Sequence, residues 1–151
     1  MSDLETIEIF LPPKLAKFVS LKLKETNYRL SADCRFGALI KARLVHSFYT
    51  DPNPESKIKV TCHASPRCLN GIGGHFTRAS FMALEKELEY MLKDELYHDV
   101  IRFKFSMGVP IHKVILNFYE RYNLCEEDWK LSSARKMIDR RLKKELPYKV
   151  R

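Results

Sequence analysis

The sequence has no long hydrophobic run, little glycine and no low-complexity tract. No apolar segment approaches the roughly 20 residues that a membrane-spanning helix needs. The first residues, 1–5, lack the basic region and apolar core of a secretory signal. The hydrophobic fraction of 45% is nevertheless ample for a packed core, which argues against a disordered chain. These features predict a cytoplasmic protein without a membrane partner, in which the four cysteines are reduced thiols.

Metal and nucleotide motifs are also missing. Cys62, His63, Cys68 and His75 are zinc-competent ligand types, but no Cys-x-x-Cys knuckle is present. Neighbours such as Cys62 and His63 would also point to opposite faces of a strand. The glycine-rich residues 71–74 lack both the Gly-Lys-Ser/Thr ending of a Walker loop and the third glycine of the Rossmann pattern. We therefore expect no metal and no cofactor.

Catalytic candidates are few. His98 and Asp99 lie next to Glu95, but close neighbours on a helix do not converge on one point. Cys125 has no evident histidine partner. The sequence therefore predicts a protein that is not an enzyme.

The first half of the chain has the pattern of a small strand-helix lobe. Residues 6–11 alternate as a strand does, and the prolines at 12 and 13 precede a helical pattern of Leu15, Phe18, Val19 and Leu23. Residues 27–30 are a candidate second strand, and Ser31 or Asp33 could cap a helix with apolar positions Phe36, Leu39, Ile40, Leu44 and Val45. Residues 49–54 form a turn or linker, and residues 57–62 alternate again.

The second half is predicted to be helical. Thr77 can cap a long helix whose apolar stripe runs from Phe81 through Val100 to Phe103, and whose other side carries six acids. A second helix begins at Ile111, and a third occupies residues 131–146. We expect an α+β fold in which an N-terminal strand-helix lobe, residues 1–54, packs on a three-helix, helix-turn-helix-like bundle, residues 76–151. Residues 55–75 supply a strand and a glycine-rich connection, and all three parts form one integrated domain.

The positive charge of the chain is concentrated at its end. Residues 129–151 hold nine Lys and Arg against Asp139 and Glu145, a net +7 in a chain whose formal charge is +8. At 100° per residue, Leu131, Ala134, Ile138 and Leu142 share one side of the third helix. Lys136, Arg140 and Lys143 lie on the other. An amphipathic helix with a cationic back is suited to binding a polyanion, because each cation that meets a phosphate releases a counterion.

Three successive helices, of which the last is basic and amphipathic, predict a helix-turn-helix. In that motif the last helix enters the major groove of double-stranded DNA. The groove-facing residues would be Lys136, Arg140 and Lys143, with Lys144 as a further DNA contact. Arg135 and Arg141 would flank them as phosphate contacts, and Ser132 and Ser133 could hold a phosphate at the start of the helix. Two features fit less well. The turn from Tyr122 to Leu131 is longer than usual, and it carries acids that could instead favour the N-terminus of the last helix, with Trp129 anchoring the turn in the core.

Two alternatives remain open at this level. The first strand followed by two helices also fits a ribbon-helix-helix, in which strands of two subunits pair and contact DNA. The chain could instead be a non-catalytic assembly module whose basic and acidic faces mate with each other or with another protein. DNA is favoured over RNA, and a homodimer fits the need of small modules for two half-sites.

Two short blocks resemble small uncharacterised proteins of bacterial phages and conjugative elements. The residues that carry the resemblance are Ile9-Phe10-Leu11-Pro12 with Leu15-Ala16-Lys17-Phe18-Val19, then Phe118, Tyr122-Asn123-Leu124, Glu126, Asp128, Lys136 and Arg140-Arg141. They cover about a third of the chain, which has Ala134-Arg135 where a more basic pair is expected. The resemblance implies a DNA-associated, regulatory role in a mobile element.

Overall fold

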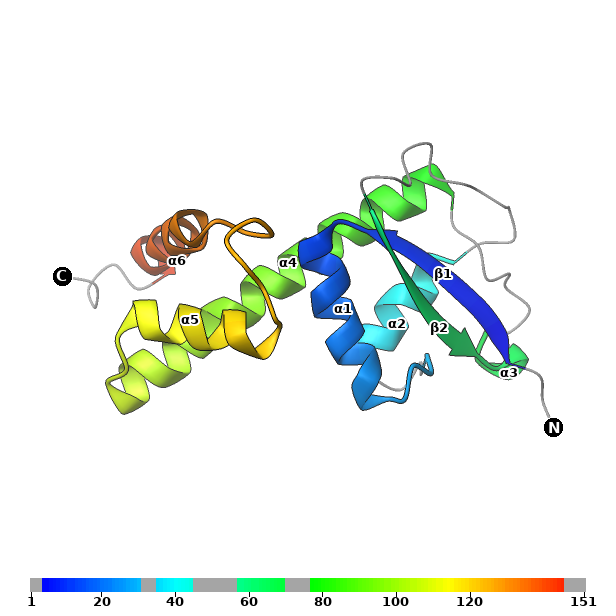
Figure 1. The fold of residues 1–151 in the computed structure, drawn as a ribbon, viewed down its shortest axis with the longest axis horizontal. Helices are drawn as coiled ribbons and strands as arrows, with labels where there is room; N and C mark the ends of the chain where they lie inside the picture. The colour runs from blue at the N-terminus through cyan, green and yellow to red at the C-terminus, as the bar shows by residue number, and fades with distance from the viewer. Residues whose placement is uncertain (1–3, 31–34, 45–56, 70–76, 146–151) are drawn as a thin grey trace. The chain divides into compact units, whose positions relative to one another are not determined.

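A computed structural model describes residues 4–30, 35–44, 57–69 and 77–145 (Figure 1). The chain forms two compact units, Met1–Leu88 and Glu89–Arg151. The first holds a two-stranded antiparallel sheet with helices, and the second is helical among the described residues. The predicted α+β class is confirmed. The units divide within the long helix, after Leu88, rather than at the composition changes near residues 54 and 76.

In the first unit, β1 (Glu5–Leu11) pairs with β2 (Ile58–Ala64) in a register that sets Ile7 opposite Cys62 and Ile9 opposite Val60. Alternation buries one face of this pair completely at Ile7 and Ile9. The helix α1 (Pro13–Glu25) packs against both strands, and it buries Leu15, Phe18, Val19 and Leu23 as predicted. Because β1 pairs with β2 of its own chain, the observed strand pairing is not that of a ribbon-helix-helix.

The predicted strand at residues 27–30 is wrong. Asn27 and Tyr28 have φ angles of 57° and 60°, which belong to a turn after α1. The amide of Tyr28 donates to the carbonyl of Leu23 at 2.7 Å, so the helix end captures this segment. Only Arg29 forms a bridge, to His63 of β2. Local hydrogen bonds at the helix terminus therefore override the β-favouring composition.

Two short helices complete the described part of this unit. They are α2 (Arg35–Ala42), with Leu44 buried beyond its end, and α3 (Pro66–Leu69), which the sequence did not predict. The Ser65 hydroxyl accepts from the amide of Cys68 at 3.0 Å and starts α3. The predicted caps at residues 31 and 33, Val45, the linker 49–54 and the glycine-rich residues 71–74 lie outside the described residues.

The long helix α4 (Arg78–Val100) begins at Thr77, as predicted. The Thr77 hydroxyl accepts from the amide of Ser80 at 3.1 Å, and the Ser80 hydroxyl accepts from the amide of Thr77 at 2.7 Å. This reciprocal cap satisfies two amides at the helix start. The predicted apolar stripe is buried at Phe81, Leu84, Leu88, Leu92, Leu96 and Val100.

Beyond Val100 the helix widens into a π-helical segment, η2 (Ile101–Phe105). The wider turn shifts the side-chain register, so Phe103 is only half-buried and the prediction that it continues the stripe is wrong. No residue of η2 is buried. Gly108, at φ 71°, ends the segment: its amide donates to the Lys104 carbonyl at 2.9 Å, and the amide of Val109 donates to the Phe103 carbonyl at 3.0 Å.

Two further helices complete the second unit. They are α5 (Ile111–Arg121), which follows Pro110, and α6 (Leu131–Glu145). The helix α5 buries Val114, Ile115, Phe118 and Tyr119, and it packs against both α6 and η2. Among the described residues, no helix is both long and apolar enough to cross a membrane.

Candidate nucleic-acid interface

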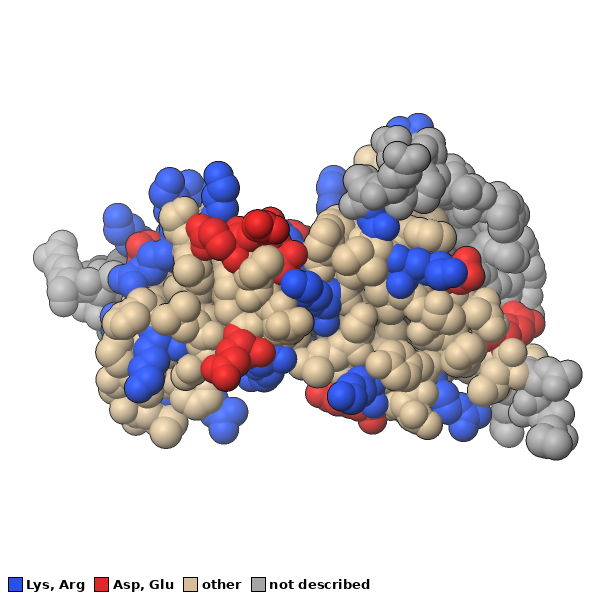
Figure 2. Space-filling model, in the orientation of Figure 1, with Lys and Arg blue, Asp and Glu red and all other residues tan. Residues whose placement is uncertain are grey.

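The helix α6 is amphipathic in the way that its sequence predicts. Ala134, Ile138 and Leu142 are 0% exposed and form its inner side. The outer side carries four exposed cations, which we call the α6 face: Lys136, Arg140, Lys143 and Lys144. Figure 2 shows Lys and Arg side chains gathered over α6. Burial of three apolar residues at helical spacing fixes which side meets solvent.

Within the described part of the chain, none of these four cations forms an ion pair. The remaining two cations of α6 differ. Arg135 pairs with Asp139 at 3.2 Å, one helical turn away, so its charge is partly compensated at the surface. Arg141 pairs across to α4. The α6 face therefore has no acidic compensation among the described residues, whereas Arg135 and Arg141 are paired within the protein.

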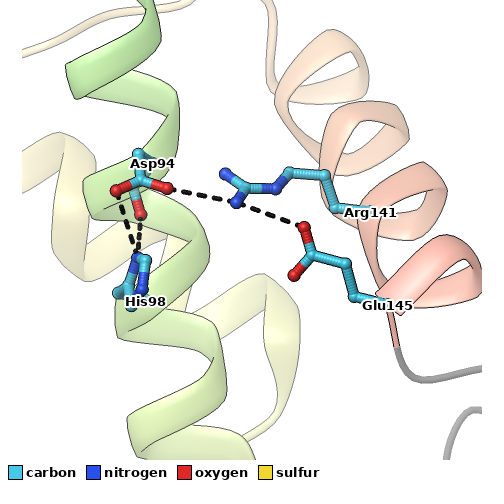
Figure 3. Close-up of polar contacts among 4 residues, drawn as sticks. All are labelled: Asp94, His98, Arg141 and Glu145. Carbon is cyan, nitrogen blue, oxygen red and sulfur yellow. Dashed lines mark hydrogen bonds and ion pairs between the residues drawn. The ribbon is translucent and has the colours of Figure 1, made fainter.

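Arg141 connects α6 to α4 (Figure 3). Its guanidinium lies 3.1 Å from the Asp94 carboxylate and 3.5 Å from that of Glu145. It also lies over the ring of Tyr97, 3.9 Å from the ring centroid, and its side chain is 24% exposed. The sequence predicts Arg141 as a phosphate contact, whereas the structure places it in an internal anchor.

The Tyr97 hydroxyl completes this anchor. Burial first, and then its hydrogen bond to the Glu145 carboxylate, raise the pKa of Tyr97. The phenol therefore stays protonated at neutral pH and donates to Glu145. His98 lies on the same turn of α4, with Nδ1 at 3.4 Å from an Asp94 carboxylate oxygen and 2.8 Å from the Asp94 carbonyl oxygen. The contacts of Arg141 with Asp94 and Tyr97, and of Tyr97 with Glu145, hold α6 on α4.

A second ion-pair cluster joins α4 to the end of α5. Arg121 lies 2.7 Å from Asp99 and 3.5 Å from Glu95, and its guanidinium lies over the rings of Phe118 and Tyr122. The Tyr122 hydroxyl donates a short hydrogen bond to Glu95. Burial, followed by this carboxylate, raises the pKa of Tyr122, so the hydroxyl remains the donor.

The acids of α4 are consequently not a free surface. The sequence predicts an exposed acidic side, but all six acids are half-buried and each lies within 4.0 Å of a cation, which makes that prediction wrong. In the first unit, Lys57 pairs with Glu85 at 2.7 Å and Arg43 pairs closely with Glu87. In the second unit, Lys93 pairs with Glu89, Arg121 pairs with Glu95 and Asp99, and Arg141 pairs with Asp94. Lys93 pairs with Glu89 one turn away on the same helix, whereas Lys57, Arg43, Arg121 and Arg141 come from distant parts of the sequence, so the sequence pattern could not reveal these four cations as partners.

The turn before α6 is packed as expected if Trp129 anchors it in the core and its acids lie at the N-terminus of α6. Trp129 is buried and stacks on Tyr119, with ring centroids 5.9 Å apart and an angle of 19° between the planes. The Tyr119 hydroxyl donates to the Trp129 carbonyl at 2.6 Å, and burial, followed by the nearby Glu126 and Asp128 charges, raises the pKa of Tyr119. Trp129 therefore anchors the turn in the core.

The acids of this turn have structural partners. The Glu126 carboxylate accepts from the Leu131 amide at 2.9 Å, and Asp128 accepts from the Cys125 amide at 3.0 Å. A carboxylate at the first amide of α6 meets the positive end of the helix dipole. Because Glu126 already occupies this position, an external phosphate beside the exposed Ser132 would gain less from the helix dipole. The cationic side of α6, rather than its N-terminus, is therefore the candidate interface.

Cys62 and His63 lie on opposite faces of β2, as the alternation of a strand predicts. Cys62 is buried, and burial raises the pKa of its thiol to about 11, while His63 faces outward near Thr6. Cys68 donates to the Leu30 carbonyl at 3.5 Å. His75 lies outside the described residues, among which no group of three potential metal ligands occurs.

No protein-family model, curated protein or solved structure matches this chain.

Proposed function

We propose that the chain is a non-enzymatic protein that binds double-stranded DNA through the α6 face. The observation that carries this proposal is the set of four exposed cations on α6 that have no acidic partner among the described residues. Arg135 and Arg141 of the same helix are paired with acids, so the uncompensated charge of α6 gathers on one side of it. Because the sequence resembles mobile-element proteins, we propose that this binding regulates transcription. We also propose that the protein binds as a homodimer to two half-sites.

The dimensions of the α6 face favour duplex DNA. An α-helix with its side chains is about 10 to 12 Å in diameter, which is comparable to the width of the B-DNA major groove, about 12 Å. The small side chains of Ser132 and Ser133 precede these cations and are exposed, so they leave room for the wall of a groove. The major groove of duplex RNA is too narrow and deep for a helix, which favours DNA as the partner.

The paired acids of α4 weigh against the alternative of an assembly module. Mating of basic and acidic faces between proteins requires a free acidic face, whereas the α4 acids are already compensated by cations of the same chain. Breaking those pairs would leave half-buried charges without partners, which is costly. The positive charge of the α6 face is therefore available to an anion outside the chain.

Salt dependence tests the proposal on the unmodified protein. The four cations of the α6 face, each meeting one phosphate, contribute about −3 to −4 to the slope of log affinity against log salt concentration, so the slope should be at least this steep. Filter binding of a 20-bp duplex from 50 to 200 mM salt measures this slope, with a duplex RNA of the same length as the control. A slope near zero, or weak binding accompanied by a defined oligomer, would favour the assembly module instead.

The neighbours Arg140 and Arg141 provide a matched pair, because they share chemistry but differ in surroundings. We expect Arg140→Gln to lower duplex affinity by about five- to tenfold, as one phosphate contact is lost, with little change in stability. Arg141→Gln removes the partner of Asp94 and the contact with Tyr97, and should lower the free energy of unfolding by about 1 to 2 kcal/mol. Filter binding and urea denaturation of both variants measure the two effects, and equal DNA losses would refute the division.

A further inference from the structure

A second set of cations without acidic partners lies where η2 turns into α5. Residues 101–113, here called the η2 turn, carry Arg102, Lys104, His112 and Lys113 and not one acid. All of these residues are described, and no ion pair involves them within the described part of the chain. Arg102 lies over the ring of Phe103 at 5.4 Å and Lys104 over that of Phe105 at 5.5 Å, so each cation rests on an aromatic neighbour.

The η2 turn also exposes apolar side chains that the protein does not cover. Phe105 is 39% exposed and Met107 is 66% exposed, and η2 contributes no buried residue to the core. The turn is nevertheless fixed by the amides of Gly108 and Val109, which donate to η2 carbonyls. Single π-helical turns within α-helices occur frequently at functional sites.

We propose that the η2 turn is a second arm of the duplex-binding surface, in which Arg102, Lys104 and Lys113 contact phosphates beyond those held by α6. This inference rests on the proposed function. Both cationic sets belong to the second unit and lie on the elements that flank α5, since α5 packs against η2 and α6. On the face drawn in Figure 2, Lys and Arg side chains lie over α6 and also over the end where α4 turns into α5.

Charge and apolar exposure together fit this ligand. Ammonium and guanidinium groups bind phosphate oxygens. Exposed Phe and Met side chains of many DNA-binding proteins insert between base steps in the minor groove. A duplex that spans both arms would meet seven cations of one sign: three of the η2 turn and four of the α6 face. The footprint would then exceed that of a single helix in one groove.

Three variants that each remove three positive charges test the inference on the full-length chain. The first changes Arg102, Lys104 and Lys113 to Gln, and the second changes Lys136, Arg140 and Lys143 to Gln. The third is a control that changes the exposed Lys24, Arg35 and Lys86 of the first unit to Gln. All three have the same net charge, so a general electrostatic effect lowers affinity equally in all of them.

For the first variant we expect a 10- to 100-fold loss of duplex affinity beyond that of the control, and a salt slope shallower by about 2 to 3. Its melting temperature should change little, because no η2 side chain is buried. If this variant matches the control while the second loses binding, the η2 turn is not an arm of the interface, although α6 still binds DNA. If the second also matches the control, the proposed function itself fails.

An anionic membrane is the other surface that exposed Phe and Met beside cations could meet. Flotation of the unmodified protein with phosphatidylserine vesicles examines this outcome. Vesicle binding that the first variant loses, together with a duplex affinity equal to that of the control, would assign the η2 turn to lipid and overturn the proposal.

Discussion

The double change Lys136→Glu with Arg140→Glu should abolish duplex binding, with a loss of at least about 100-fold at 0.1 M salt. Two cations that release counterions are removed, and two carboxylates now repel the phosphates. Both side chains are exposed and neither has an acidic partner among the described residues, so folding loses no contact. Lys136 and Arg140 already form a like-charge pair at spacing i, i+4, so the double change inverts the sign of a repulsion of about 0.2 to 0.5 kcal/mol and adds none.

Filter binding and a thermal melt followed by circular dichroism measure these two outcomes together. The exchange Lys136→Arg with Arg140→Lys is the matched control, because it keeps both charges and should keep affinity within about threefold. Retained binding in the Glu variant would refute the assignment of α6. A melting temperature lowered by more than about 5 °C would mean that these residues stabilise the fold instead.

The largest effect on stability is expected for Trp129→Ala. Removing the indole leaves a cavity against Tyr119, and such changes cost about 3 to 5 kcal/mol. In a unit of this size each kcal/mol corresponds to about 4 to 8 °C, so the melting temperature of the second unit should fall by more than about 12 °C. The Tyr119 hydroxyl can still donate to the carbonyl at position 129, which makes the loss one of packing.

The variant Trp129→Phe tests whether any aromatic side chain at this position stabilises the turn or whether the indole is required. It keeps an aromatic face against Tyr119 and should cost about half as much or less, measured by the same melts. A fall of less than about 2 °C in Trp129→Ala would show that the turn before α6 does not depend on this anchor. The acids Glu126 and Asp128 would then be sufficient to hold it.

Features that depend on near neighbours in sequence were predictable. The alternation at Ile7 and Ile9, the cap at Thr77 and the inner side of α6 each follow from spacing within one element. The turn at Asn27 and the widening at η2 were not, because in both cases backbone hydrogen bonds at a helix end override the composition.

The surroundings of a charged side chain could be predicted only where that side chain has no ion-pair partner. The exposed cations at Lys136 and Lys143 follow from the helical period, whereas the fate of the α4 acids depends on arginines that are far away in sequence. Arg141 lies beside the apolar side of its helix, and this position is the one signal that could have marked it as an internal partner. The cationic η2 turn was hidden because an ordinary α-helix would have buried Phe103.

The chain contains a single tryptophan, and it lies in the second unit, stacked on a tyrosine. Tryptophan emission, excited selectively over tyrosine, therefore reports on residues 89–151 alone, whereas far-UV ellipticity sums over the whole chain. Emission and ellipticity recorded in one denaturation give the order in which the two units unfold, without any label or truncation.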